Sequence, residues 1–315
     1  MTETERVEKL IAKCRALGKT GFGFDYDGAH YVINGPEVLL QEVCVTEGKF
    51  AIPEFVTNLF RSDDRRDNAF KNCVDIKLVN NSQIKDMSSM FSRCYNLTSL
   101  DLTEFDTSRV CDMSSMFEDC LNLTALEFGN PDTHNVESME KMFSGCNKLK
   151  KLSMTIDAQN LNSMSGMFGW CGDIEEIELD VSNASKLTDM SDMFRTCTNL
   201  TMVRLNIDTQ NVKQMMGMFR FCVSLEQLDL KLATHNVVNM NEMFYACINL
   251  KRLALDFDTH NLKYLSSMFG NCRALEEIEL GDGFTLPPDN DKAKIFSGCS
   301  SLKRIINKGA PICLL

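Results

Sequence analysis

The chain contains few of the residues on which catalysis near neutral pH depends. Its 315 residues include four histidines and one tryptophan. Histidine is the side chain whose ordinary pKa lies closest to neutrality. No Cys-x-x-Cys pair, glycine-rich phosphate loop, His-Glu-x-x-His or Gly-x-Ser-x-Gly motif occurs. The sequence therefore predicts a protein that is not an enzyme and that needs no cofactor and no metal ion.

The chain also lacks an excess of basic charge and long apolar stretches. It has 33 lysines and arginines against 44 aspartates and glutamates, a formal net charge of −11. A phosphate backbone would be repelled, so nucleic acid is a poor partner. No apolar run approaches the roughly 18 residues of a membrane-spanning helix, and residues 1–5 lack the basic and apolar regions of a secretory signal. These absences predict no membrane insertion and a cytoplasmic location; the alternative is a secreted or cell-surface protein whose leader has been removed.

One motif is repeated along most of the chain. Nine phenylalanines recur every 25 to 27 residues, and each is followed three residues later by a cysteine. The phenylalanines are Phe91, Phe117, Phe143, Phe168, Phe194, Phe219, Phe244, Phe269 and Phe296, and the cysteines are Cys94, Cys120, Cys146, Cys171, Cys197, Cys222, Cys247, Cys272 and Cys299. A period in this range is typical of a solenoid, in which each coil contacts only its neighbours.

The first part of each repeat has the spacing of a short amphipathic helix. Met87, Met90, Phe91 and Cys94 fall at i, i+3, i+4 and i+7, which places them on one face. Asp86 precedes them, as a residue that accepts hydrogen bonds from first-turn amides would. The pattern predicts a helix of two turns in every coil.

The second part of each repeat has the pattern of a strand. Leu97, Leu100 and Leu102 follow a Leu-x-x-Leu-x-Leu spacing, whose last part alternates between two faces. Strands from successive coils would stack as a parallel sheet about 4.8 Å apart. An Asp-Thr-x-Asn-Val turn follows, as at residues 208–212, and its side chains would hydrogen-bond local backbone and the next coil.

The repeat resembles the BspA-type leucine-rich repeats, in particular the Met-Phe-rich short class found in many bacterial surface proteins. The resemblance implies an α/β leucine-rich-repeat solenoid with a short strand and a short helix per coil, a parallel sheet on one side and a cap at each end. It also implies protein binding, commonly adhesion. We divide the chain into an N-terminal cap (1–66), the repeats (67–305) and a C-terminal cap or tail (306–315).

The cysteines of the repeat could form disulfides, bind metal or pack as apolar groups. Each lies on the apolar face, where a small hydrophobic residue would pack. Helices of neighbouring coils would stand about 8–10 Å apart, beyond the roughly 7 Å between Cα atoms that a disulfide allows. We expect a column of free, buried thiols, with thiol or metal chemistry as the less favoured alternative. The methionines of the two helical positions are expected in the core for the same reason.

Two other features each have a structural and a functional interpretation. His235 and His260 share one turn position in adjacent coils, but no third ligand accompanies them, which favours surface turns over a metal site. Trp170 replaces an outward-facing residue and is either an interaction anchor or packed on a neighbouring coil.

The outward-facing strand positions are the candidate binding surface, because the repeat leaves them free to vary. Acidic residues dominate them, with a few basic residues between. The predicted site consists of Glu176, Glu178, Asp180, Arg204, Asp229, Lys231, Arg252 and Asp256. Its partner would be a protein with a basic patch, bound in a salt-sensitive way. The alternative is a charged face that only maintains solubility. An adhesin, or an intracellular scaffold, effector or phage-related binding protein, could use this surface.

Overall fold

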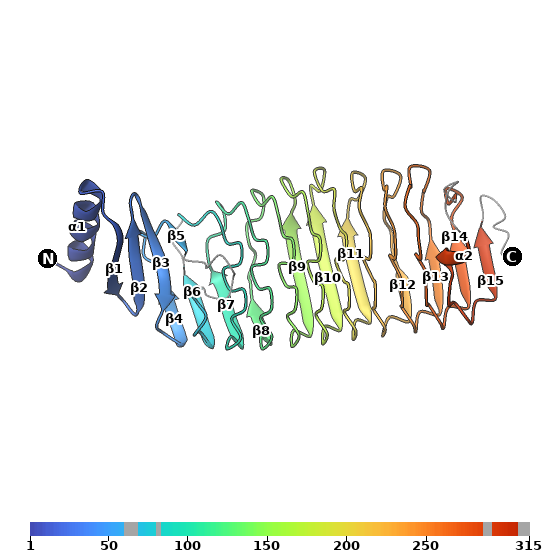
Figure 1. Cartoon of the computed structure of the whole chain (residues 1–315), viewed down its shortest axis with the longest axis horizontal. Helices are drawn as coiled ribbons and strands as arrows, with labels where there is room; N and C mark the ends of the chain where they lie inside the picture. The colour runs from blue at the N-terminus through green and yellow to red at the C-terminus, as the bar shows by residue number, and fades with distance from the viewer. Residues whose placement is uncertain (60–68, 80–82, 286–291, 308–315) are drawn as a thin grey trace.

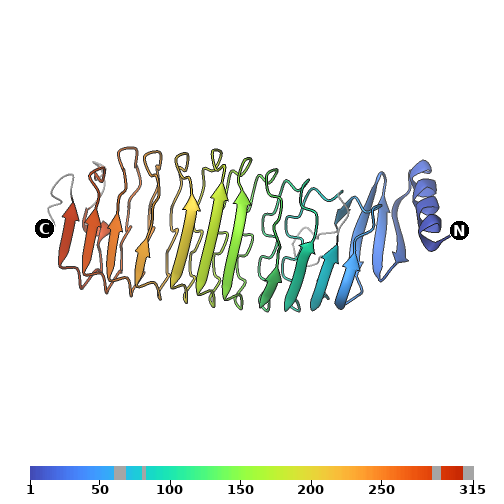
Figure 2. The same ribbon diagram turned by 180° about the vertical axis from the view of Figure 1, so that it is seen from behind.

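The computed structural model describes residues 1–59, 69–79, 83–285 and 292–307. Over these residues the chain forms an elongated solenoid. Helix α1 (Glu3–Ala16) lies at one end and strand β15 (Arg304–Asn307) lies near the other (Figure 1). Seen from behind, the coils again stand side by side along the long axis (Figure 2). The described part of the chain contains no helix that is long and apolar enough to cross a membrane.

The N-terminal end is covered by α1 and a four-stranded sheet. The strands, in the order β1-β2-β3-β5, are β1 (Thr20–Tyr26), β2 (Ala29–Asn34), β3 (Glu37–Val43) and β5 (Asn58–Leu59). Helix α1 begins with a capping box between Thr2 and Glu5, which satisfies two amides that the helix itself cannot. The face of α1 toward the sheet buries Val7, Ile11 and Cys14.

A hairpin with a turn at Asp27-Gly28 joins β1 to β2. Asp27 and Gly28 have φ angles of 44° and 74°, as a two-residue hairpin turn requires. Leu17, the residue that caps the C-terminal end of α1, is 62% exposed.

Each coil contributes one strand, and successive strands are parallel. The first sheet contains β4 (Glu47–Ala51), β6 (Asp75–Val79), β7 (Ser99–Glu104) and β8 (Ala125–Glu127). The second contains β9 (Lys151–Asp157), β10 (Glu176–Ser182) and β11 (Met202–Ile207). The third contains β12 (Gln227–Asp229), β13 (Arg252–Leu255), β14 (Glu277–Leu280) and β15. The leucine-rich-repeat solenoid with a parallel sheet is therefore confirmed. The sheet is interrupted twice, between β8 and β9 and between β11 and β12.

The prediction of a short helix in every coil is wrong. Between Met87 and Cys94 the chain makes successive tight turns, in which Ser89 and Arg93 have φ angles of 56° and 59°. Every second amide donates to the next coil; the Phe91 amide, for example, donates to Met116 O at 2.8 Å. A residue with left-handed backbone ends a helix. The apolar spacing of this segment is therefore produced by successive turns and not by a helix. The one short helix near the C-terminal end is α2 (Lys292–Ile295).

The residues expected to start these helices do make the predicted hydrogen bonds. Asp86 Oδ1 accepts from the Ser88 amide at 2.9 Å, and Asp112 Oδ1 accepts from the Ser114 amide at 2.7 Å. The same position forms a bridge between successive coils from Asp86 through to Tyr264. The turn side is therefore held together without interruption from coil to coil.

The core is a set of stacked columns. From Phe91 to Phe296, neighbouring phenylalanine rings of the repeat have centroids 5.1–5.7 Å apart. The methionines of the two expected positions are buried, as are eight of the nine repeat cysteines; Cys299 is half-buried. The packing of the repeat thiols in a buried column is confirmed. The spacing of 8–10 Å expected between neighbouring coils was wrong, because the coils are joined by parallel bridges and therefore stand closer together than packed helices would.

The turn after each strand also connects the coils. Thr209 Oγ1 donates to Ala233 O of the next coil at 2.9 Å, and Asn211 Nδ2 donates to Ser185 O of the preceding coil at 2.9 Å. The first bond satisfies a partly buried carbonyl group, and the second ties together two exposed turns. The structural role expected for this turn is confirmed.

The boundaries of the cap and tail stay predictions. The limit between residues 66 and 67 lies outside the described residues, as do residues 308–315 of the predicted tail. Strand β4 lies within the predicted cap but pairs with β6 of the repeats.

Candidate functional site

The parallel register places charged side chains next to one another on the strand face. Along β10, Ile177, Leu179 and Val181 are buried, so the alternate residues Glu178 and Asp180 point outward. The register then sets Glu178 beside Arg204 and Asp180 beside Asn206 of β11.

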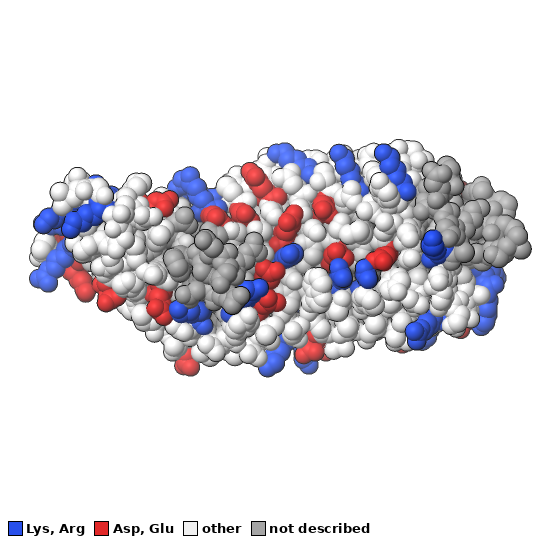
Figure 3. All heavy atoms as spheres, viewed as in Figure 1, with Lys and Arg blue, Asp and Glu red and all other residues white. Residues whose placement is uncertain are grey.

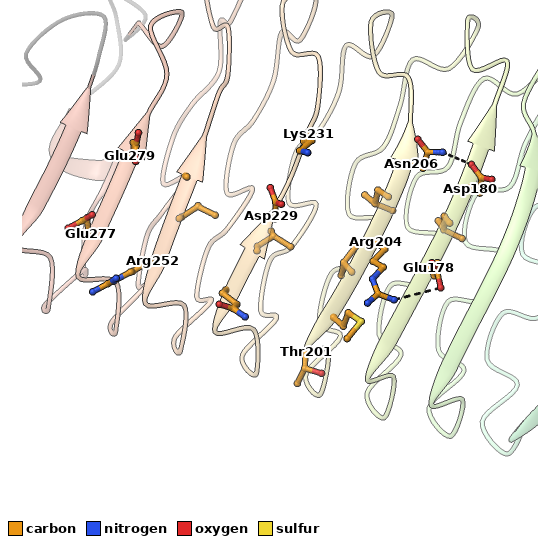
Figure 4. A pocket seen from close by; sticks show the side chains of 18 residues that line it. Glu178, Asp180, Thr201, Arg204, Asn206, Asp229, Lys231, Arg252, Glu277 and Glu279 are labelled. Carbon is orange, nitrogen blue, oxygen red and sulfur yellow. Dashed lines mark hydrogen bonds and ion pairs between the residues drawn. The ribbon is translucent and has the colours of Figure 1, made fainter.

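A hollow of about 1030 Å³ lies on this face, over β10 to β14. Six of the eight predicted site residues line it, and Figure 4 shows their side chains. They are Glu178, Asp180, Arg204, Asp229, Lys231 and Arg252. The hollow thus combines three basic and three acidic residues of the predicted set, drawn from four coils.

Few of these charges form ion pairs with residues that the structure describes. Arg204 Nη1 lies 4.0 Å from Glu178 Oε2, and both side chains are more than half exposed, so this pair contributes about 1 kcal/mol or less. Asn206 Nδ2 donates to Asp180 Oδ1 at 2.7 Å. Within the described ranges, Asp229 and Lys231 form no ion pair. A partner can therefore pair with charges that the fold leaves available.

Two of the predicted residues do not line the hollow. Glu176 accepts from Lys151 Nζ at 2.8 Å, and this hydrogen bond raises the pKa of Lys151 above its usual value. Asp256 lies one strand position beyond β13. The hollow brings in Asn206, Glu277 and Glu279, which occupy outward strand positions visible in the sequence.

Sequence reasoning missed that the apolar core is partly open here. Leu205 and Ile207 of β11 are only partly buried, whereas their β10 counterparts Leu179 and Val181 are 1% and 5% exposed. The reason is the break in the sheet, because β11 has no strand partner on its β12 side. The apolar strand positions of the repeat are kept at this point, although Ala233 replaces the aspartate of the turn that follows β12. The apolar spacing therefore gives no signal of the break.

A second cluster of aromatic and charged residues lies on the turn side. The Arg195 guanidinium lies 4.9 Å from the Trp170 ring, and Arg220 lies 5.3 Å from the Tyr245 ring. Arg195 also pairs with Asp192 at 3.5 Å, and burial raises the pKa of that carboxyl. Trp170 is 45% exposed, so it packs against a neighbouring coil while keeping nearly half its surface in solvent. Figure 3 shows acidic and basic side chains interspersed over the side seen in Figure 1.

The histidines of the turns contact carboxylates of their own turns. His134 Nδ1 lies 2.5 Å from Asp132 Oδ1, and His260 Nδ1 lies 2.6 Å from Asp258 Oδ1. Hydrogen bonding to the histidines lowers the pKa of both aspartates. Over the ranges that the structure covers, no group of three or more His, Cys, Asp or Glu side chains is placed to hold a metal ion.

The repeat thiols are chemically protected. Burial raises the pKa of Cys120, Cys171 and Cys247 to about 12. Since the thiolate is the reactive form, these groups are poor nucleophiles. Cys299 differs, because hydrogen bonding with Cys272 lowers its pKa.

Comparison with known families supports the repeat assignment. Residues 58–178 and 162–282 match the family described as "Mycoplasma protein of unknown function, DUF285". The chain belongs to this family. This DUF285 protein has no match among curated proteins.

The solved structures that match this chain include leucine-rich proteins of bacteria. A leucine rich cell surface protein from Faecalibacterium prausnitzii is 16% identical with a TM-score of 0.37, and the alignment covers 93% of this chain and 96% of that one. The pneumococcal vaccine antigen PcpA is 13% identical with a TM-score of 0.37, covering 92% and 88%. The T. pallidum leucine-rich-repeat protein is 12% identical with a TM-score of 0.29, covering 91% and 84%.

Proposed function

We propose that this DUF285 protein is a non-enzymatic recognition module that binds a protein partner through the strand face over β10 to β14. The observation that carries the proposal is the hollow there, which gathers Asp229, Lys231 and Arg252 without ion pairs within the described part of the chain. Unpaired charges around a recess suit recognition of a complementary surface.

The partner proposed is a protein segment with a basic patch. The strands that line the hollow present Glu178, Asp180, Asp229, Glu277 and Glu279 against Arg204, Lys231 and Arg252. The acidic residues are in excess on a chain whose net charge is −11. Attraction between opposite charges mainly increases the association rate, and it weakens as salt is added.

A surface of this kind could serve an adhesin outside the cell or a scaffold inside it. The cellular location of the protein stays a prediction. Affinity capture should therefore use both a cell-surface fraction and a soluble extract. The bait is the wild-type chain, compared with the triple variant Glu178→Lys, Asp180→Lys, Asp229→Lys.

A matched control separates the site from net charge. The triple variant Glu127→Lys, Glu137→Lys, Glu140→Lys makes the same change in charge at exposed residues outside the hollow. A partner that wild type and the control retain, and that the site variant loses, supports the proposal. If the site variant retains the partner as well as wild type does, the binding surface lies outside the hollow.

A further inference from the structure

The interval between β11 and β12, termed the slot, is one of the two places where successive strands are not hydrogen-bonded to each other. β11 pairs with β10 on one side, and β12 pairs with β13 on its far side, so the two strands are edges of different sheets. Strand edges carry backbone N–H and C=O groups that are available to another chain. Here two such edges face each other.

The slot is closed behind the strands. On the turn side, the bridge between Gln214 and Asn239 is intact, and the rings of Phe219 and Phe244 have centroids 5.7 Å apart. The two coils therefore separate only at the strand face, and the core forms the floor of the opening.

The slot is also closed at both ends. Before the strands, the Ser224 amide donates to Thr198 O at 3.2 Å. After the strands, Thr209 Oγ1 donates to Ala233 O at 2.9 Å. The opening is therefore confined to the length of β11, and an occupant must enter and leave from the strand face.

The lining selects a particular occupant. The floor includes Leu205, which is only partly buried at this interval. The rim carries Arg204 and Asp229 on the two facing strands, with Asp180 and Lys231 beyond them (Figure 4). Because strand side chains alternate in direction, an extended segment here would place apolar side chains toward the floor and charged ones at the rim.

We propose that the slot takes a short extended peptide segment of the partner, with alternating apolar and basic residues, as an added strand between β11 and β12. This inference rests on the proposed function and specifies how the same face binds. Strand addition gives affinity through main-chain hydrogen bonds, and the side-chain pockets give specificity. The segment also covers Leu205, which is only partly buried.

The second break, between β8 and β9, provides an internal comparison. Leu126 and Leu152 are also only partly buried there. The outward residues include Glu127, while Lys151 is already paired with Glu176. A probe that recognises unpaired strand edges alone would bind at both breaks, whereas the rim described above favours the break beside Asp229.

The test uses two peptides and two variants of the full chain. The first peptide is acetylated and amidated Lys-Ile-Lys-Ile-Lys, and the second is the same peptide with both isoleucine amides N-methylated. Affinity is measured by calorimetry, and hydrogen–deuterium exchange locates the contact. The variants are Asp229→Lys at the slot and Glu127→Lys at the other break.

We expect the first peptide to slow exchange in residues 202–207 and 227–229. The N-methylated peptide should bind at least about tenfold more weakly, because two of its backbone donors are blocked. Asp229→Lys should weaken binding and Glu127→Lys should not. No binding, or protection away from these strands, overturns the inference. Equal affinity of the two peptides also overturns strand insertion; if Asp229→Lys still weakens both, charge recognition by the face survives and the proposed function stands.

Discussion

The thiol of Cys171 donates a hydrogen bond to the carbonyl oxygen of Phe143 in the preceding coil, with Sγ and O 3.0 Å apart. The same bond recurs along the stack, as between Cys197 and Phe168 and between Cys222 and Phe194. Each phenylalanine thus links two columns, because its ring stacks on its neighbours while its carbonyl accepts from a thiol. Cysteine is small enough to pack at this position and its thiol can donate a hydrogen bond, whereas alanine packs there but has no side-chain donor.

Replacing this cysteine tests how much the hydrogen bond contributes. We expect Cys171→Ala to lower the free energy of unfolding by about 1–2 kcal/mol, since it removes a buried sulfur and one donor. The loss is moderate because Phe143 O still accepts from the Cys146 amide. Cys171→Ser should cost less, because its hydroxyl can still donate. Urea unfolding of both variants measures this, with exposed Cys111→Ala as the control. A serine variant no more stable than the alanine variant would mean that the position requires only an apolar group.

The buried thiols also predict how stability depends on pH. Burial raises the pKa of Cys171 to about 12 from its usual value of 9.0. Below pH 9 the thiol is neutral in both states, so its contribution is fully present. Between pH 9 and 12 only the unfolded chain ionises, and stability should fall by about 1.4 kcal/mol per pH unit for each such cysteine.

Urea unfolding under reducing conditions from pH 8 to pH 10.5 checks this prediction. Cys171→Ala should give a shallower decline than wild type, which separates the thiol from lysines and tyrosines that titrate in the same range. Parallel declines for the two proteins would show that this thiol does not contribute to the pH dependence.

Thiol reactivity should divide the cysteines into clear classes. At pH 8 the exposed Cys44 and Cys111 should react first with a small alkylating reagent, followed by half-buried Cys299, whose pKa is lowered. The eight buried repeat cysteines should react only after denaturation. Mass spectrometry of labelled peptides gives the order, in a Cys313→Ser background because residue 313 lies outside the described residues. Rapid native labelling at Cys171 or Cys197 would favour thiol chemistry over packing.

The solenoid, its strands and its core columns could be predicted because every coil repeats the same apolar positions. Phe194, Met190 and Cys197 must face the interior in any arrangement that stacks the repeats, and all three are fully buried. The outward direction of Glu178 and Asp180 follows equally from strand alternation. Local spacing was sufficient for these features.

The helix was mistaken because tight turns can share its apolar spacing. The sequence did contain a contrary signal at two positions of the repeat. Gly166 and Gly217 occupy the position of Ser89, and Gly145 occupies that of Arg93; all three glycines have positive φ. Glycine recurring at fixed positions inside a supposed helix indicates left-handed backbone. The breaks in the sheet left no such signal, because they depend on how whole coils stack.

These left-handed positions give a pair of opposite predictions. Lys141 has a φ of 53° and Gly166, at the same position of the next coil, has a φ of 62°. Lys141→Gly should stabilise the protein by up to about 1 kcal/mol, because glycine avoids the steric cost of this conformation. Gly166→Ala should destabilise it by about 1 kcal/mol, because alanine introduces that cost.

The surroundings of Lys141 and Gly166 indicate that backbone conformation dominates both changes in stability. Lys141 is exposed, so its removal leaves no cavity. A Cβ on Gly166 would lie 3.3 Å from Lys141 Cγ, the nearest heavy atom, which makes backbone strain the main cost. Thermal and urea unfolding measure both changes, and the double variant removes the contact between the two side chains. If a helix formed here in solution, the signs would reverse: Gly166→Ala would stabilise the protein and Lys141→Gly would destabilise it.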